Sequence, residues 1–261
     1  MVDILAKDLT VAYDNKLVLS DLAIDVPEGK ITSIIGPNGC GKSTLLKSLS
    51  RILPLKTGVV LLDGRDIHRL DTKEVARKLA LLPQMQDSLE GISVYDLVSY
   101  GRFPHQNQFG CLTKIDREKI DWALDKTNTR EFASLSVQSL SGGQRQRVWI
   151  AMALAQDTDL IFLDEPTTYL DMHHQLEVLL LLQELNQQYK KTIVMVLHDI
   201  NHAARFSDYI IAMKEGQIVC QGQAETVITA DNLRQIFQVE AEILPANHYG
   251  YPLLTTYFPI V

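Results

Sequence analysis

The sequence contains no apolar run long enough to cross a membrane as a helix. Such a span needs about 18 consecutive apolar residues, whereas the densest run, Val178–Leu182, is flanked by Glu177 and Gln183. The first ten residues, MVDILAKDLT, lack the basic segment and the long apolar segment of an export signal. We therefore expect neither a membrane-spanning helix nor a signal peptide.

Cysteine and positive charge are also scarce. The three cysteines, Cys40, Cys111 and Cys220, are widely spaced and form no metal-type pair, which indicates a reducing cytosol. Lys and Arg number 25 against 32 Asp and Glu, so the net charge is −7. Because proteins that mainly bind nucleic acid or anionic lipid are usually basic, we expect no nucleic-acid partner.

What remains is a globular composition. The chain has 261 residues, of which 46% are hydrophobic and 22% charged, enough for one large domain or a domain with an added lobe. It contains no long internal repeat and no low-complexity linker. We expect one copy of one module.

The apolar pattern predicts an α/β fold. Short alternating runs up to Val26 indicate an antiparallel sheet. Buried strands are predicted at 30–35, 78–82, 160–163 and 192–197, and helices at 43–52, 72–79 and 172–189. Residues 86–156 contain no comparable strand and are predicted to form mostly helix. This pattern favours an α/β core with a mainly parallel sheet and an inserted helical subdomain.

The segment GPNGCGKST, here called the phosphate loop (Gly36–Thr44), lies between a predicted strand and a predicted helix. Its glycines allow backbone N–H groups to curl around phosphate oxygens. Lys42 is placed to reach the β- and γ-phosphates, and the Ser43 hydroxyl to bind Mg²⁺. The nucleotide-binding residues predicted here are Gly36, Pro37, Asn38, Gly39, Cys40, Gly41, Lys42, Ser43 and Thr44.

The segment LIFLDEP (160–166) is an apolar strand that ends in two acids. Such a pair is often only a solvated turn. With a phosphate loop in the same chain, we expect Asp164 to hold Mg²⁺ and Glu165 to orient the water that attacks the γ-phosphate.

Three further residues are candidates. His198 ends a predicted strand, where open α/β sheets place their ligands, and is predicted to contact the γ-phosphate. Gln84 follows another strand and is a candidate ligand of Mg²⁺ or water. Tyr13 is placed to stack on adenine, although surface packing explains it equally well.

A second candidate anion site lies in SLSGGQRQR (139–147). Ser141, Gly142, Gly143 and Gln144 precede or begin a predicted helix, whose free N–H groups and dipole favour an anion. Helix capping alone explains Ser141 but not the two adjacent glycines.

These motifs, in this order, resemble the ATP-binding subunits of ABC transporters. The resemblance covers about 2–225 and rests on the phosphate loop, Gln84, the LSGGQ segment (Leu140–Gln144), LIFLDE, the TTYLD segment (Thr167–Asp171) and His198. It implies the P-loop NTPase core of an ABC ATPase with an N-terminal antiparallel part. Many members have Ser-Ala-Leu-Asp where this chain has Thr168–Asp171. We interpret Tyr169 as a mark of a subfamily, because Asp171 is kept.

The resemblance also implies a mechanism and partners. In family members the LSGGQ segment of one chain closes over the γ-phosphate held by the other, so a head-to-tail homodimer binds two MgATP. Lys42, Glu165 and His198 are then the catalytic residues, and Ser43, Gln84 and Asp164 the metal ligands. Tyr13 becomes the adenine-stacking aromatic, Gln84 the link from Mg²⁺ to the helical lobe, and Asp171 part of the communication between the two chains.

Within the family, the segments at 100–106, 167–179 and 197–219 resemble ATPases of bacterial ferric-siderophore importers. We expect two permease subunits, one of whose helices meets residues 86–105, a substrate-binding protein, and a place on the cytoplasmic face of the bacterial inner membrane. The expected domains are an ATP-binding domain over 2–240 and an extension over 241–261. A haem or cobalamin importer, an exporter and a non-transport ABC ATPase remain alternatives.

Overall fold

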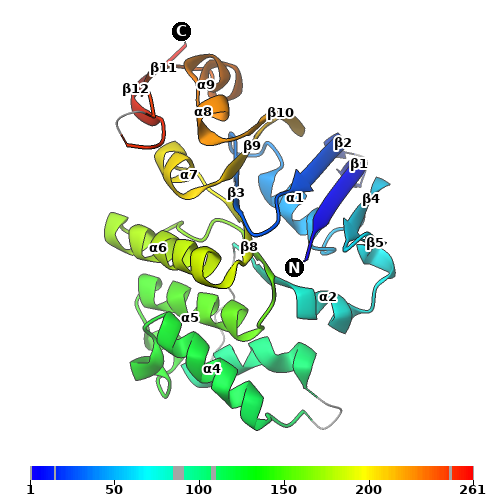
Figure 1. The fold of residues 1–261 in the computed structure, drawn as a ribbon, viewed down its shortest axis with the longest axis vertical. Coiled ribbons are helices and arrows are strands. Elements are labelled where there is room, and N and C mark those ends of the chain that lie inside the picture. Colours follow the sequence, from blue (N-terminus) through cyan, green and yellow to red (C-terminus); the bar gives the residue numbers. More distant parts are fainter. Residues whose placement is uncertain (1, 15, 85–90, 107–109, 247–248, 261) are drawn as a thin grey trace. The chain divides into compact units, whose positions relative to one another are not determined.

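The computed structural model describes residues 2–14, 16–84, 91–106, 110–246 and 249–260. The chain divides into two compact units, one formed by residues 1–69 with 192–261 and the other by residues 70–191 (Figure 1). Each unit contains strands and helices. The predicted domain boundaries, 2–240 and 241–261, stay a prediction.

The first unit begins with an antiparallel sheet and continues into a parallel one. Its described elements are β1 (Ile4–Tyr13), β2 (Lys16–Val26), β3 (Ile31–Ile35), α1 (Lys42–Leu49), β4 (Thr57–Leu62), β5 (Arg65–Asp66), η1 (Ile67–Arg69), β8 (Thr192–Val196), α7 (Ile200–Phe206), β9 (Tyr209–Lys214), β10 (Gln217–Gly222), α8 (Ala224–Val227), α9 (Ala230–Phe237), β11 (Val239–Leu244) and β12 (Leu253–Pro259).

Two sheets of this unit explain its sequence pattern. The antiparallel sheet has the strand order β2-β1-β4-β5, as the alternating pattern predicted. Strand β3 pairs in parallel with β8 on one side and β9 on the other. All five residues of β3 are buried, as are all five of β8. A parallel strand covered on both faces needs apolar residues throughout, which is why these strands were recognisable.

The helix predicted at 43–52 is shorter than expected. Helix α1 ends at Leu49, and the backbone N–H of its C-cap Ser50 donates to Leu46. Arg51 then adopts a left-handed conformation with φ +64°. This conformation ends a helix, so the prediction was wrong by about one turn.

The C-terminal part of this unit, whose role the sequence pattern left open, is a hairpin joined to the core. Strand β11 pairs antiparallel with β12. The side-chain amide of Asn201, on α7, donates to the backbone oxygen of Leu254 (3.0 Å) and its oxygen accepts from the Leu254 N–H (2.8 Å). The hairpin is therefore attached to α7 through a reciprocal pair of hydrogen bonds.

The second unit is mainly helical. Its described elements are α2 (Thr72–Lys78), β6 (Leu79–Leu82), α3 (Val94–Ser99), η2 (Tyr100–His105), α4 (Lys114–Lys126), η3 (Arg130–Phe132), η4 (Val137–Ser139), α5 (Gly142–Ala155), β7 (Leu160–Leu163) and α6 (Met172–Tyr189). Strands β6 and β7 pair in parallel. Helix α5 lies between α4 and α6 in Figure 1. The predicted helical stretch at 86–156 is confirmed over its described residues.

A buried ion pair joins three elements of this helical unit. The Arg102 side chain donates from Nε to Asp116 Oδ1 (2.8 Å) and from Nη1 to the Ala155 oxygen (2.7 Å). The two charged side chains are only 4% and 3% exposed. Asp116 also forms the capping box of α4 with Thr113. One carboxylate therefore holds η2, the start of α4 and, through Arg102, the end of α5.

We expect Asp116→Ala to lower the free energy of unfolding by about 3–5 kcal/mol, because it leaves the buried Arg102 charge without this partner. Burial raises the pKa of Asp116, but hydrogen bonds from Thr113 and Arg102 outweigh it and hold the pKa below 3.8. A lowered folded-state pKa gives stability that is present above the unfolded-state pKa and lost as the pH falls through the folded one. Denaturant unfolding at pH 7 and below pH 4 measures both effects.

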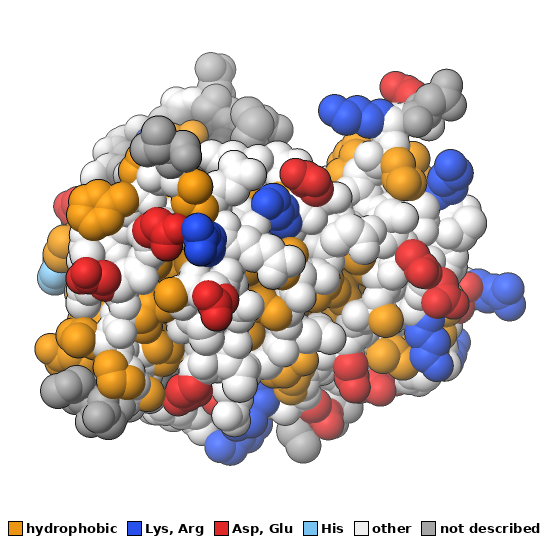
Figure 2. Space-filling model, turned by 90° about the horizontal axis from the view of Figure 1, so that it is seen from above, with side chains coloured by type: hydrophobic (Ala, Val, Ile, Leu, Met, Phe, Trp, Pro, Cys, Tyr) orange, Lys and Arg blue, Asp and Glu red, His pale blue; other side chains and the backbone are white. Residues whose placement is uncertain are grey.

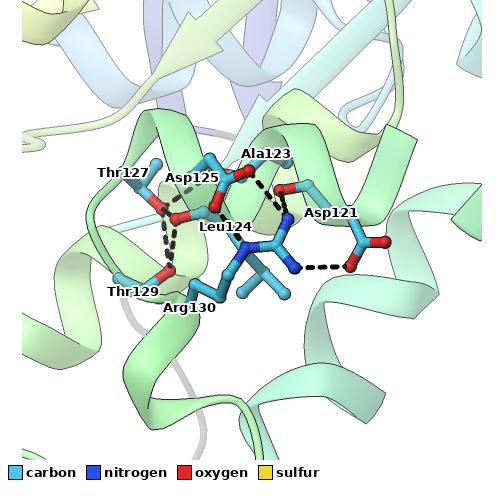
Figure 3. Close-up of polar contacts among 7 residues, drawn as sticks. All are labelled: Asp121, Ala123, Leu124, Asp125, Thr127, Thr129 and Arg130. Carbon is cyan, nitrogen blue, oxygen red and sulfur yellow. Dashed lines mark hydrogen bonds and ion pairs between the residues drawn. The ribbon is translucent and has the colours of Figure 1, made fainter. Parts of the chain in front are cut away.

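The exposed cluster around Arg130 supplies the matched control. Arg130 donates to the Asp121 side chain (3.1 Å) and backbone (2.9 Å) and to both oxygens of Asp125, beside the Thr127–Thr129 hydroxyl pair (Figure 3). Its side chain is 49% exposed, so Arg130→Ala should cost less than about 1 kcal/mol. Equal losses for the two variants would show that burial does not decide the energy of these pairs.

One face of the molecule shows how its charged side chains are distributed. On the face drawn in Figure 2, acidic and basic side chains are interspersed, with hydrophobic side chains scattered among them. Among the described residues, no helix has the length and apolar character that a membrane crossing demands.

Candidate functional site

The phosphate loop follows β3 directly, and its backbone requires glycine. Gly36, Gly39 and Gly41 have φ angles of +149°, +76° and +106°. A Cβ on Gly36 would lie 2.3 Å from the Met213 backbone oxygen, and one on Gly41 would lie 2.7 Å from Leu19 Cδ2. Since L-residues rarely adopt these angles and these two positions have no room for a side chain, the loop conformation depends on glycine.

We expect Gly36→Ala to abolish ATP binding and to lower the melting temperature by several degrees or more. The reason is that the new methyl group collides with backbone at Met213 and moves the loop. Gly64→Ala is the control, because Gly64 also has a positive φ (+70°) but, apart from its chain neighbours, no described residue has an atom within 4 Å of its Cβ position. It should cost only about 1–2 kcal/mol. Thermal unfolding with and without ATP separates the two, and equal behaviour would refute the clash.

Lys42 is folded onto the loop that it belongs to. Its side chain is buried, and Nζ donates to the backbone oxygens of Gly36 (2.9 Å) and Pro37 (3.0 Å). Lys42 also begins α1, so the backbone N–H groups of Ser43 and Thr44 belong to the first turn of this helix. A cation and a helix N-terminus therefore lie together at the loop, which suits a phosphate group.

Cys40 packs inside the loop as a small hydrophobic residue. It is 5% exposed. Burial raises the pKa of its thiol more than the nearby Lys42 lowers it. The thiol is therefore protonated at neutral pH and is not an activated nucleophile.

His198 lies at the same edge of the parallel sheet as the phosphate loop. Ile34 of β3 pairs with Val196 of β8, and the Leu197 N–H donates to the Ile34 oxygen (3.2 Å). Gly36 and His198 each lie two residues beyond this pair, and His198 is exposed. Tyr13, at the end of β1, is 47% exposed. Neither position contradicts the role predicted for it.

In the second unit, Gln84 and Glu165 meet although 81 residues separate them. Leu82 of β6 pairs with Leu163 of β7, so the two residues follow neighbouring strand ends. Gln84 Nε2 donates to Glu165 Oε2 at 2.6 Å, and Thr168 Oγ1 donates to the same oxygen at 3.0 Å. These bonds fix the orientation of the Glu165 carboxylate.

Asp164 and Glu165 differ in environment and backbone. Asp164 is only 2% exposed, and its N–H donates to the Leu82 oxygen (2.9 Å). Glu165 has a left-handed φ of +55°, unusual for a residue with a side chain. The turn directs two adjacent carboxylates into different surroundings.

The LSGGQ segment forms the start of α5. Ser141 is the N-cap: its hydroxyl accepts from the Gln144 N–H (3.3 Å), and Gln144 Oε1 accepts from the Ser141 N–H (3.0 Å). Apart from its chain neighbours and the backbone of α5, no described residue has an atom within 4 Å of the position that a Gly142 Cβ would take. The contacts of the described residues therefore do not require glycine at 142.

A pocket of about 520 Å³ connects this helix start to Glu165 within the same unit. It is lined by Gln84, Gly142, Arg145, Gln146, Glu165, Thr168, Tyr169 and Leu170. Polar groups from three segments thus converge on one space, as in a binding site.

Comparison with known proteins identifies the family. Residues 19–168 match the family described as ABC transporter. The iron(3+)-hydroxamate import ATP-binding protein FhuC of Bacillus subtilis (strain 168) is 53% identical over 251 residues, which are 96% of this chain and 93% of FhuC. The chain belongs to the ABC transporter family.

Solved structures of ABC proteins support the same conclusion. One of them is an ABC transporter assigned to the metal-chelate type, in an inward-facing conformation. It superposes on this chain with a TM-score of 0.84 and 30% sequence identity, and the match covers 100% of this chain and 98% of the other chain. A dimeric ATP-binding cassette in a post-hydrolysis state, bound to ADP and Pi, has a TM-score of 0.73 and 30% identity, covering 85% of this chain and 98% of its own. The predicted ABC ATPase fold is confirmed, and the chain binds and hydrolyses ATP as an ABC ATPase.

The metal ligands predicted for this ABC ATPase are chemically suited to Mg²⁺ but divided between the units. Ser43 lies in the first unit, and Gln84 and Asp164 in the second. Hydroxyl, amide and carboxylate oxygens are the ligand types that Mg²⁺ takes. Among the described residues no cluster of three or more His, Cys, Asp or Glu forms a metal cage.

Two side chains that line the site were not predicted from the sequence as site residues. Thr168 was recognised only as part of the TTYLD segment, yet it donates to Glu165. Arg145 lines the pocket one residue beyond the LSGGQ segment. Their positions next to recognised motifs were the available signal, and their contacts depend on the folded loops.

Proposed function

We propose that this chain is the ATP-hydrolysing subunit of an ABC importer for ferric siderophores. Two copies bind two MgATP head to tail and drive a pair of membrane-embedded permease subunits, with a substrate-binding protein that delivers the cargo. The ATPase acts on the cytoplasmic face of the bacterial inner membrane, which it reaches by docking to the permease. The surface predicted at 86–105 for this docking includes residues 86–90, which lie outside the described residues.

The observation that carries the proposal is the pair of phosphate-binding structures in separate units. One is the phosphate loop with Lys42, and the other is the start of α5 with Gly142. A chain that used both structures for its own nucleotide would need no partner. When two copies close head to tail, the phosphate loop of each meets the α5 start of the other, and two equal sites are completed. The dimeric cassette with ADP and Pi supports the second arrangement.

The residues of the site suggest how hydrolysis proceeds. Glu165, oriented by Gln84 and Thr168, accepts a proton from the water that attacks the γ-phosphate. Lys42 and the N–H groups of the LSGGQ segment stabilise the charge on the transferred phosphoryl group. His198 contacts the γ-phosphate and reports its presence. Bound Mg²⁺, held by Ser43, Gln84 and Asp164, would supply positive charge at the phosphates.

The direction of transport and the cargo follow from relatives rather than from the site. FhuC is named for iron(3+)-hydroxamate import and aligns over nearly the whole of this chain. This identity favours ferric siderophore import over haem or cobalamin import and over export. A hydroxamate siderophore is the first cargo to test.

Uptake of a labelled ferric hydroxamate tests the proposal in cells that carry this chain. Cells whose only copy has Glu165→Gln should lose ATP-dependent uptake of the ferric hydroxamate and keep uptake of haem and cobalamin. Loss of haem or cobalamin uptake instead would reassign the cargo. Unchanged uptake of all three would argue against an import function.

A further inference from the structure

Gly143, the second glycine of the LSGGQ segment, has a different environment from Gly142. A Cβ on Gly143 would lie 2.8 Å from Cδ2, 3.0 Å from Cγ and 3.2 Å from Nε2 of His174. One edge of the imidazole ring therefore lies directly against the Gly143 backbone. Glycine at 143 is required by His174, a residue of α6, and not by the geometry of α5 itself.

The His174 ring is held in this place by Asp171, the last residue of the TTYLD segment. Asp171 is the N-cap of α6, and its Oδ1 lies 2.9 Å from the His174 backbone nitrogen and 2.8 Å from His174 Nδ1. Hydrogen bonds from the backbone and then the side chain of His174 lower the pKa of Asp171. Asp171 is therefore a carboxylate at neutral pH and can only accept, so Nδ1 carries the proton.

A second contact holds the same two helices one turn further along. Arg147 of α5 donates from Nη1 to Glu177 Oε2 of α6 at 3.4 Å. The Arg147 side chain is 17% exposed and that of Glu177 35%. Of these two contacts between described residues of α5 and α6, the His174 contact is the one that reaches the LSGGQ and TTYLD segments themselves.

We propose that His174 is a positioning residue that makes the LSGGQ and TTYLD segments move as one piece when two copies close on ATP. It acts through Asp171 on one side and through Gly143 on the other. The proposal rests on the proposed function, in which the LSGGQ segment covers the nucleotide of the partner copy. The His174 ring, packed against Gly143, then keeps the LSGGQ segment and the TTYLD segment in one relative position.

A double-mutant cycle on Gly143 and His174 tests the proposal. Gly143→Ala alone should lower kcat for ATP about tenfold to a hundredfold, because small displacements of positioning groups have effects of this size. His174→Ala alone should lower kcat about fivefold, through the released Asp171. The double variant should resemble His174→Ala, because no ring remains for the new methyl group to strike. A double variant whose loss is the product of the two single losses would overturn the proposal.

Thermal unfolding provides an independent readout that does not depend on catalysis. Gly143→Ala should lower the melting temperature in the wild-type background. In the His174→Ala background it should raise the melting temperature, since alanine within a helix is more favourable than glycine. If Gly143→Ala lowered the melting temperature by a similar amount in both backgrounds, the proposed contact between Gly143 and His174 would be overturned. This readout applies even if one variant were too unstable for kinetics.

Two measurements separate positioning from general damage to the fold. Affinity of the single chain for ATP should stay within about twofold of wild type in every variant, since only the closed state uses the pair. His174→Asn should recover most of the activity lost in His174→Ala, because its side-chain N–H can still donate to Asp171. Weakened ATP binding, or an Asn variant no better than Ala, would overturn the role.

His173→Ala is the matched control. His173 is the adjacent histidine, its side chain is 79% exposed, and it approaches Glu177 (3.6 Å) rather than Asp171. Its kcat should match wild type. Failure of the proposed function can be told apart from failure of the His174 inference. If the proposed function is wrong, Glu165→Gln with His174 intact will form no ATP-dependent dimer, and that result overturns both proposals. An intact dimer with multiplicative losses overturns this inference alone.

Discussion

Replacing Glu165 by Gln lowers the turnover of ATP by a factor of about 10²–10⁴, the range typical of general-base catalysis, and leaves ATP affinity close to wild type. Glutamine keeps the shape of the side chain but cannot accept a proton from water. Gln84 and Thr168 both direct hydrogen bonds to Glu165 Oε2, so the carboxylate is held in one orientation. Steady-state hydrolysis together with equilibrium ATP binding measures both quantities.

Glu184→Gln is the matched control for this prediction. Glu184 lies in the same unit, where it accepts from Lys126 Nζ at 2.8 Å. Its side chain is 42% exposed, so loss of this surface pair should change turnover little. Near-normal hydrolysis by Glu165→Gln would remove Glu165 from the catalytic role.

Replacing Ser141 by Arg abolishes ATP-dependent dimer closure, and with it nearly all hydrolysis, while ATP still binds to the single chain. The substitution removes the capping box with Gln144, which costs about 1 kcal/mol of helix stability. It also places a long cation where the partner's nucleotide is expected. Light scattering measures closure, and equilibrium binding to the isolated chain measures affinity.

Ser93→Arg separates these two effects. Ser93 is also an N-cap, at the start of α3, where its hydroxyl accepts from the Asp96 N–H at 3.1 Å. It should lose similar helix stability and keep ATP-dependent closure. If Ser141→Arg and Ser93→Arg closed equally well, the start of α5 would not lie at the contact between copies.

The parts of the fold that could be predicted from sequence are those whose cause is local. The parallel strands β3, β7 and β8 are short apolar runs because both of their faces are buried. The phosphate loop combines glycines with a lysine in a fixed order, so its chemistry is visible in nine consecutive residues.

Other features depend on contacts between distant segments. The bond from Gln84 to Glu165 follows from the register of β6 and β7, which no local pattern reveals. Likewise, Gly142 and Gly143 are identical in sequence, yet one faces open space and the other meets His174. The two glycines could be told apart only once α5 and α6 were placed together.

The central claim is that the two phosphate-binding structures of one chain meet those of a second copy. Size-exclusion chromatography with light scattering on Glu165→Gln, with and without MgATP, tests it most directly, because this variant should hold ATP without hydrolysing it. We predict the mass of one chain without nucleotide and of two chains with MgATP. A mass of one chain in both conditions, with ATP shown to be bound, would contradict the claim.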